Sequence, residues 1–230
     1  MNDEAATLRE GRPLWALAGL GVTLAGPFFL SSEPAQNFYK LAGSDHGAVF
    51  LGQLCFTLTL VAALLCLTLG EKLPLASVGL VRPQLRSVLT GIAIGGGVFA
   101  VLFGAAVVLS HFGKFDTRQA AAVVLDWPLW LKIYAVVTAG VVEEAIYRGY
   151  AISRLTALTG RRWLAAALSL AAFVVAHLPF WGVGAIATPL IGGAFFTIVY
   201  LWRRDLIAVM SAHVMVDFVG LILAPMLGAH

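Results

Sequence analysis

Apolar runs of about twenty residues alternate with short polar segments along nearly the whole chain. Each run is long enough to cross a hydrocarbon core of about 30 Å as a helix. Seven runs are predicted to span a membrane: 14–30, 48–69, 87–110, 127–158, 163–178, 186–202 and 206–227. The pattern therefore predicts an all-α polytopic transmembrane helix bundle of about seven helices, up to eight. We expect residues 1–230 to form a single integral membrane domain.

A secretory signal peptide is the competing interpretation of the first run. Asp3, Glu4 and Glu10 precede this run, whereas a signal peptide begins with a positively charged segment and ends at a small-residue cleavage site. We therefore favour a retained helix. The polar segment 31–46 is predicted to be a loop, and 111–126 is predicted to lie at the surface, in part as a helix.

Glycine and proline positions indicate how the helices meet and end. Gly91 and Gly95 are four residues apart in the third run, which would let a neighbouring helix approach closely. Pro179, Gly182 and Gly184 are expected to separate the fifth helix from the sixth.

The composition supports a membrane location, because 60% of the residues are hydrophobic, only 12% are charged and the mean hydropathy is +0.90. We expect a protein of the bacterial inner (plasma) membrane whose surroundings are a lipid bilayer. The net charge of +3 does not indicate nucleic-acid binding, because the basic residues lie in short loops. Cys55 and Cys66 lie in one apolar run and are interpreted as small hydrophobic residues.

The distribution of lysine and arginine predicts the orientation of the bundle. With a cytoplasmic N-terminus, the cytoplasmic side would carry Arg9, Arg12, Lys72, Arg82, Arg86, Arg154, Arg161, Arg162, Arg203 and Arg204. The opposite side would carry Lys40, Lys114, Arg118 and Lys132. This excess favours an N-terminus in the cytoplasm and a C-terminus outside.

Ionisable residues lie inside three of the predicted helices, where each costs about 2.5–3.5 kcal/mol even on lenient insertion scales. They are Glu143, Glu144 and Arg148 in the fourth helix, His177 in the fifth, and His213 and Asp217 in the seventh. At about 1.5 Å per residue, Glu143, both histidines and Asp217 lie about 12–21 Å from the predicted cytoplasmic ends. We therefore predict one shared polar cavity.

These residue types outline a hydrolytic site. Glu143 is a candidate general base, and two imidazoles can hold a water molecule or stabilise an oxyanion. Glu144 and Arg148 are four residues apart and are predicted to form an ion pair on one helix face. A purely structural pair is an equally good interpretation of these two residues, whereas Glu143 and the histidines together favour function.

Three motifs resemble those of the CAAX protease and bacteriocin-processing family of intramembrane proteases, which includes the Ras-converting enzyme. They are Glu143-Glu144-x-x-x-Arg148, Phe173-x-x-x-His177 and His213-x-x-x-Asp217. The resemblance covers about 77–220, and includes the stretches SVGLVRPQLRSVLTG and GGAFFTIVYLWRRDLIAVMSAH. It implies a protease core over this segment and assorted membrane-anchored proteins or peptides as substrates.

The resemblance also implies roles for individual residues. Glu143 would activate water with the help of His177, and Phe173 would line the site. His213 and the residue at 217 would stabilise the oxyanion, while Glu144 and Arg148 support the helix. The family more often has Asn at 217, and because an ionised aspartate cannot donate a hydrogen bond, we assign Asp217 to orienting His213.

Cofactor and function each have an alternative. The resemblance implies hydrolysis without a protein-bound metal, but Glu143, His177 and His213 would be an adequate zinc ligand set, although the chain has no His-Glu-x-x-His helix. The alternative function is a non-catalytic membrane protein. A proton-coupled transporter, or an immunity or chaperone protein, would use the same charges as a relay or docking site.

Overall fold

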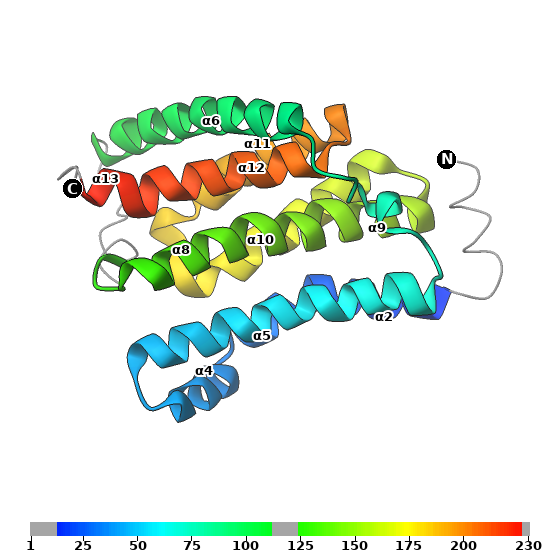
Figure 1. Cartoon of the computed structure of the whole chain (residues 1–230), viewed down its shortest axis with the longest axis horizontal. Helices are drawn as coiled ribbons and strands as arrows, with labels where there is room; N and C mark the ends of the chain where they lie inside the picture. Colours follow the sequence, from blue (N-terminus) through cyan, green and yellow to red (C-terminus); the bar gives the residue numbers. More distant parts are fainter. Residues whose placement is uncertain (1–12, 112–123, 227–230) are drawn as a thin grey trace.

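The computed structural model describes residues 13–111 and 124–226, and within them it contains helices and connecting turns but no strand. Seven helical segments run back and forth across the bundle, which confirms the predicted fold class (Figure 1). Residues 112–123 of the predicted surface segment 111–126 lie outside the described residues, as do the N-terminal polar residues 1–12. The predicted loop cations Arg9, Arg12, Lys114 and Arg118 are among them.

Four of the seven segments are composite helices. The first consists of α2 (Pro13–Leu20), η1 (Gly21–Ala25) and α3 (Gly26–Leu30), and the second of α5 (Asp45–Leu65) and η3 (Cys66–Gly70). The third is α6 (Leu85–His111). The fourth consists of α8 (Leu129–Thr138), η5 (Ala139–Ala151) and α9 (Ile152–Thr159). The last three are α10 (Arg162–Ala185), α11 (Ala187–Arg203), and α12 (Leu206–Phe218) continued by η6 (Val219–Leu223) and α13 (Ala224–Met226).

Five of these segments are long and apolar enough to cross a membrane by length and composition. They are Pro13–Leu30, Asp45–Gly70, Leu85–His111, Arg162–Pro179 and Leu206–Met226. The fourth segment differs because it carries several charged residues, and α11 differs because it has only 17 residues. Both nevertheless lie in the bundle beside the other helices (Figure 1).

The prediction of a loop over 31–46 was wrong for most of its length. This segment contains α4 (Glu33–Tyr39) and the short helix η2 (Lys40–Ala42). Ser32 is extended before the first turn, and a proline occupies that turn, which favours a helix start. The Tyr39 side chain is buried, and its hydroxyl donates a hydrogen bond to the Leu30 carbonyl at 3.2 Å.

The interruption predicted near Pro179 is present. Helix α10 continues through Pro179 and breaks at Gly182, where the backbone has φ 69° and ψ 172°. This positive φ is accessible to glycine without a Cβ clash, so the residue type explains the position of the break.

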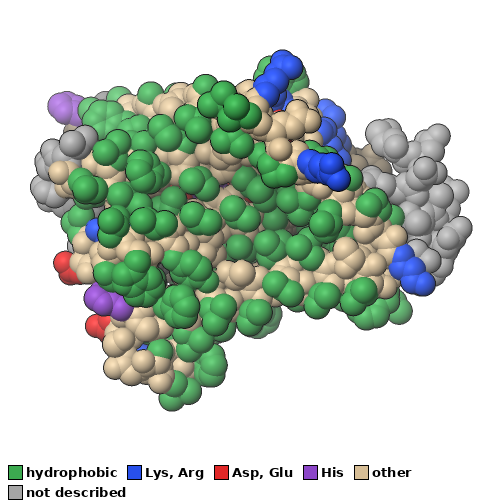
Figure 2. Space-filling model, in the orientation of Figure 1, with side chains coloured by type: hydrophobic (Ala, Val, Ile, Leu, Met, Phe, Trp, Pro, Cys, Tyr) green, Lys and Arg blue, Asp and Glu red, His purple; other side chains and the backbone are tan. Residues whose placement is uncertain are grey.

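The basic residues predicted to lie in loops are found at the two ends of the bundle where they are described. One end of the bundle carries the basic residues of the connecting turns and the start of α6, which are Lys72, Arg82, Arg86, Arg161 and Arg204. Lys40 and Lys132 lie toward the other end. Figure 2 shows apolar side chains over most of one face, with Lys and Arg gathered mainly near the end where α9 lies. A cytoplasmic location of this end stays a prediction.

The predicted close approach at Gly91 and Gly95 is confirmed, because helix α6 packs against α12 at these positions. A Cβ atom at Gly95 would lie 2.5 Å from the Ala212 carbonyl oxygen, and one at Gly91 would meet the Ala208 carbonyl oxygen. Backbone atoms cannot move aside as a flexible side chain can. The two glycines therefore fix the distance between α6 and the helix that carries His213.

Substitution of Gly95 by Ala is expected to lower stability by about 1–3 kcal/mol, because the added methyl group overpacks this interface. The matched control is Gly96→Ala, where an added Cβ has nothing within 4 Å. Gly96→Ala should be neutral or slightly stabilising, because alanine is the better helix former. Denaturant unfolding in detergent micelles measures both, and equal stability of the two variants would contradict the assigned packing role.

Candidate active site

The wide helix η5 carries the first group of candidate residues. It is a 13-residue π-helix within the fourth segment, and the Ile152 amide at its end bonds back to the Tyr147 carbonyl, five residues earlier. Stretches of π-helix are rare and frequently occur at functional sites. Gly140 and Gly149 let neighbouring segments approach closely, since a Cβ at either position would collide with Val214 or with the Val78 carbonyl oxygen.

Glu144 and Arg148 form the predicted ion pair inside this helix. Arg148 Nη1 lies 2.9 Å from Glu144 Oε1, and the two side chains are 1% and 0% exposed. Arg148 Nη2 also donates to the Gly193 carbonyl at 3.0 Å, and its Nε approaches the Thr197 hydroxyl at 3.4 Å. The guanidinium therefore joins η5 to α11 as well as balancing the carboxylate.

Glu144 also contacts His213, which the sequence did not indicate. His213 Nδ1 lies 2.7 Å from Glu144 Oε1, the same oxygen that accepts from Arg148. An ionised carboxylate only accepts, so Nδ1 donates in this hydrogen bond. Asp217 Oδ2 lies 3.5 Å from the other ring nitrogen, Nε2. Glu144 thus holds the orienting nitrogen of His213, and Asp217 lies on the nitrogen that faces the site.

Glu143 Oε2 lies between the two imidazoles. It is 3.8 Å from His177 Nε2 and 4.0 Å from His213 Nε2. These separations are too long for direct hydrogen bonds, and polar groups at such distances can share a water molecule. The oxygen is buried and accepts no hydrogen bond from the described residues, which is unusual for a carboxylate without a catalytic or ligand-binding role.

His177 is held by the backbone of its own helix. Its Nδ1 lies 2.7 Å from the Phe173 carbonyl oxygen, and because a carbonyl only accepts, Nδ1 carries the proton. Nε2 of the neutral ring is then free to accept a hydrogen bond toward Glu143. The Phe173 ring is buried and packs against the His177 ring at 4.3 Å between centroids, with the two planes tilted by 43°.

The family comparison agrees with this geometry. Residues 125–219 match the family described as type II CAAX prenyl endopeptidase Rce1-like. This segment therefore resembles the Rce1-like family. All three motifs, from Glu143 to Asp217, lie within the Rce1-like segment, which confirms the resemblance predicted from them. The family indicates a membrane-embedded protease of the CAAX type. No curated protein and no solved structure matches the chain.

Sequence reasoning missed three residues of the Rce1-like segment that contact the site. They are Gly193, Phe196 and Thr197, all on α11. Gly193 and Thr197 are four residues apart and share a helix face toward Arg148. Small and aromatic residues in an apolar helix do not stand out from packing residues, so these three received no role although they lie in the GGAFFTIVYLWRRDLIAVMSAH stretch of the resemblance.

A second buried charge cluster lies toward the end of the bundle where α9 begins. Arg154 Nη1 is 3.0 Å from Glu71 Oε2, and the Tyr150 hydroxyl donates to Glu71 Oε1 at 2.7 Å. Glu71 precedes the Rce1-like segment, whereas Arg154 and Tyr150 lie within it. Arg154, predicted at the cytoplasmic end of the fourth helix, is fully buried. The cluster connects the loop after η3 to the end of the helix that carries Glu143 and Glu144.

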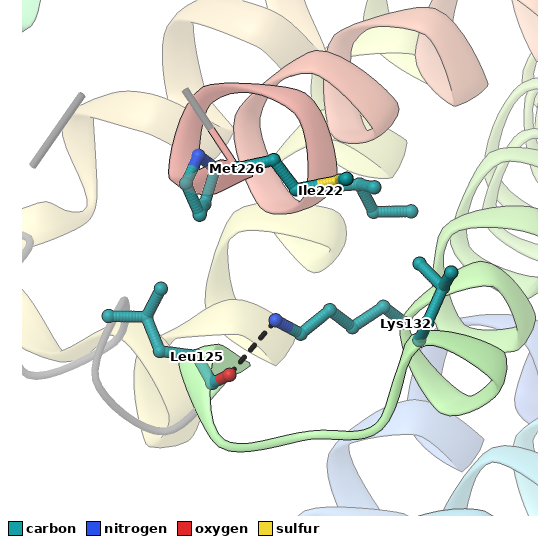
Figure 3. Close-up of a pocket in the computed structure, with 6 residues that line it drawn as sticks. Leu125, Lys132, Ile222 and Met226 are labelled. Carbon is teal, nitrogen blue, oxygen red and sulfur yellow. Dashed lines mark hydrogen bonds between the residues drawn. The ribbon is translucent and has the colours of Figure 1, made fainter. Parts of the chain in front are cut away.

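An apolar groove lies elsewhere, where α8 begins and the last helix ends (Figure 3). It is lined by Leu125, Leu129, Lys132, Ile222, Pro225 and Met226. Lys132 Nζ donates to the Leu125 carbonyl at 2.9 Å across its floor. The groove contains none of the motif residues, so it is separate from the candidate active site.

The proposed zinc ligands are further apart than a metal requires. Zinc bonds of about 2.0–2.2 Å place tetrahedral donors about 3.3–3.5 Å apart, whereas Glu143 Oε2 is 3.8 and 4.0 Å from the two imidazole nitrogens. In the part of the chain that the structure describes, no group of three His, Cys, Asp or Glu residues has the geometry of a metal site. At these separations the three atoms would have to move closer together to form a tetrahedral zinc site.

Proposed function

We propose that this protein is an intramembrane endopeptidase that hydrolyses a peptide bond of a membrane-anchored protein or peptide with water activated by Glu143. The observation that supports this most directly is the buried Glu143 Oε2 atom, 3.8 and 4.0 Å from two imidazole nitrogens and without a described hydrogen-bond donor. A water molecule placed between these three atoms would have partners for both of its hydrogens.

The first step is attack of this water on the scissile carbonyl carbon. One hydrogen of the water is directed to Glu143 Oε2 and the other to the unprotonated Nε2 of His177, so a lone pair faces the substrate. As the new C–O bond forms, Glu143 takes the proton and the carbonyl π electrons move onto oxygen. The resulting tetrahedral intermediate carries the negative charge.

His213 is placed to stabilise this oxyanion. Its Nδ1 is held by Glu144, so Nε2 of the doubly protonated ring can donate a hydrogen bond into the site. Asp217 Oδ2, 3.5 Å from the same nitrogen, limits rotation of the ring, so that the Nε2 proton points into the site. Collapse of the intermediate breaks the C–N bond, and the proton held by Glu143 passes to the leaving amine. The products are one carboxylate and one amine, with water consumed.

The family description names a prenyl endopeptidase, and we therefore include prenylated C-termini among the proposed substrates. The scissile bond must reach Glu143 among the helices. This requirement favours substrates that the bilayer already holds, whether by a lipid or by an apolar segment.

The substrate class is tested in cells by comparing the termini of membrane proteins with the wild-type chain and with Glu143→Gln as the only copy. New termini that depend on Glu143 identify substrates and their anchors. A non-catalytic transporter, immunity or chaperone function predicts the same set of termini in both strains, and that result would overturn the endopeptidase proposal.

Metal dependence is tested separately. A chelator such as 1,10-phenanthroline is expected to leave peptide hydrolysis by the purified protein within about twofold, because Glu143 rather than a metal activates the water. Loss of activity that added zinc restores would instead establish Glu143, His177 and His213 as zinc ligands.

A further inference from the structure

The two histidines of the site are held in the same way. Each has its Nδ1 in a 2.7 Å hydrogen bond, His177 with the Phe173 carbonyl and His213 with Glu144. Each also has a phenyl ring against its face. Phe173 lies 4.3 Å from the His177 ring, and Phe196 lies 4.8 Å from the His213 ring at an interplanar angle of 30°. Both rings present Nε2 to Glu143 Oε2.

One hydrogen bond does not fix an imidazole. The torsion that rotates a histidine ring has a broad energy profile, so an anchored Nδ1 still allows the ring plane to turn. A flat ring packed on its face removes that freedom. Phe196 is 3% exposed and belongs to the main apolar core, so its own position is well defined.

Phe196 also contacts the ion pair that anchors His213. The Arg148 guanidinium carbon lies 4.3 Å from the Phe173 ring centre and 5.9 Å from the Phe196 ring centre. The guanidinium thus lies near both rings, each of which packs on one histidine. This arrangement keeps water away from Arg148 and Glu144 and strengthens their hydrogen bonds.

We propose that Phe196 is a positioning residue that fixes the plane of the His213 imidazole, so that Nε2 points to the oxyanion of the intermediate. The assignment of an oxyanion rests on the proposed function. The orientation of the ring does not, since it follows from contacts within the protein. Phe196 lies on α11, outside the three motifs, and acts through His213 without touching the substrate.

The test replaces Phe196 by Met, which retains apolar volume but has no flat face. The matched control is Phe195→Met, because Phe195 is the adjacent residue and is 39% exposed on the outside of the bundle. A third variant, Phe196→Tyr, restores the ring. Thermal unfolding in detergent micelles verifies that all three fold.

The catalytic measurement uses quenched-fluorescent peptides, one farnesylated at a C-terminal CAAX cysteine and one with an apolar anchor segment. Phe196→Met should lower kcat by about 10-fold to 100-fold, because a misplaced catalytic group loses rate steeply with distance. KM should change by less than about threefold. Phe195→Met should match wild type, and Phe196→Tyr should recover most of the lost kcat. Unchanged kcat, or a loss confined to KM, would overturn the proposal.

A spectroscopic measurement tests the positioning role of Phe196 independently of peptide cleavage. If the wild-type protein cleaves neither peptide, the proposed function is contradicted, but this measurement still tests whether Phe196 orients His213. In protein labelled with ¹⁵N-histidine, the His213 signals are assigned by comparison with His213→Asn. Wild type and Phe195→Met should show one state with Nδ1 protonated, and Phe196→Met should show exchange between ring states. Identical His213 signals in Phe196→Met and wild type would refute a positioning role.

Discussion

Replacement of Glu143 by Gln is expected to lower kcat for peptide hydrolysis by at least about 10³-fold. An amide has the shape of the carboxylate but takes no proton from water, and general-base catalysis contributes about 10²–10⁴-fold. The expected loss lies toward the upper part of this range, because Glu143 also returns the proton to the leaving amine. The measurement is cleavage of the quenched peptides by purified protein in micelles.

The matched control is Glu33→Gln, which removes an exposed carboxylate at the start of α4. It should leave kcat and KM unchanged. Glu143→Gln should still fold, because the amide fits the same space and loses no described hydrogen bond at Oε2. Retention of more than about a tenth of the wild-type kcat would show that another group activates the water.

The helices could be predicted because apolar runs of membrane length are distinctive, and all seven predicted segments are present. The features that the hydrophobic pattern did not predict depend on contacts between helices. Helix α4 lies in a polar segment, and burial of Tyr39 against Leu30 stabilises it. The π-helix η5 could not be predicted either, because residues four positions apart lie on similar faces of an α-helix and of a π-helix.

The motif residues of the site were visible because charged and polar groups contrast with an apolar helix. The hydrogen bond between Glu144 and His213 could not be predicted in this way, because the two residues are 69 positions apart in the sequence. Phe196 could not be recognised as a site residue from the sequence, because a phenylalanine in an apolar helix resembles the other core residues. Arg154 was predicted at the cytoplasmic end of the fourth helix, where charges are normal, so its buried ion pair with Glu71 was not foreseen.

The three carboxylates of the site have different environments and therefore different tasks. Glu144 is fully buried and has two cationic or donor partners, Arg148 and His213. Asp217 is 24% exposed and lies 3.5 Å from Nε2 of His213, the nitrogen that faces the site. Glu143 and Glu144 each have one buried oxygen that accepts no hydrogen bond from a described residue, and that of Glu143 lies between the two imidazoles. The one carboxylate oxygen directed at both imidazoles is therefore the one left for substrate chemistry.

The Arg148→Met variant is expected to lose about 3–5 kcal/mol of stability, because it leaves the Glu144 carboxylate buried without its cation. Hydrolysis should fall as well, since Glu144 would no longer be held against Gly193 and Thr197 through the guanidinium. Unfolding in mixed micelles measures the stability change. The matched control is Arg161→Met, at an exposed turn, which should stay within about 0.5 kcal/mol of wild type.

A double variant separates the structural role of this pair from its role in catalysis. Glu144→Leu with Arg148→Met removes both charges, so most of the lost stability should return, as replacement of a buried pair by apolar groups is often neutral. Activity should not return, because leucine offers His213 Nδ1 no acceptor and the ring loses its anchor. If the double variant recovered both stability and kcat, Glu144 would have only a structural role. If it recovered neither, the loss of stability would come from altered packing between η5 and α11 and not from the unpaired charge.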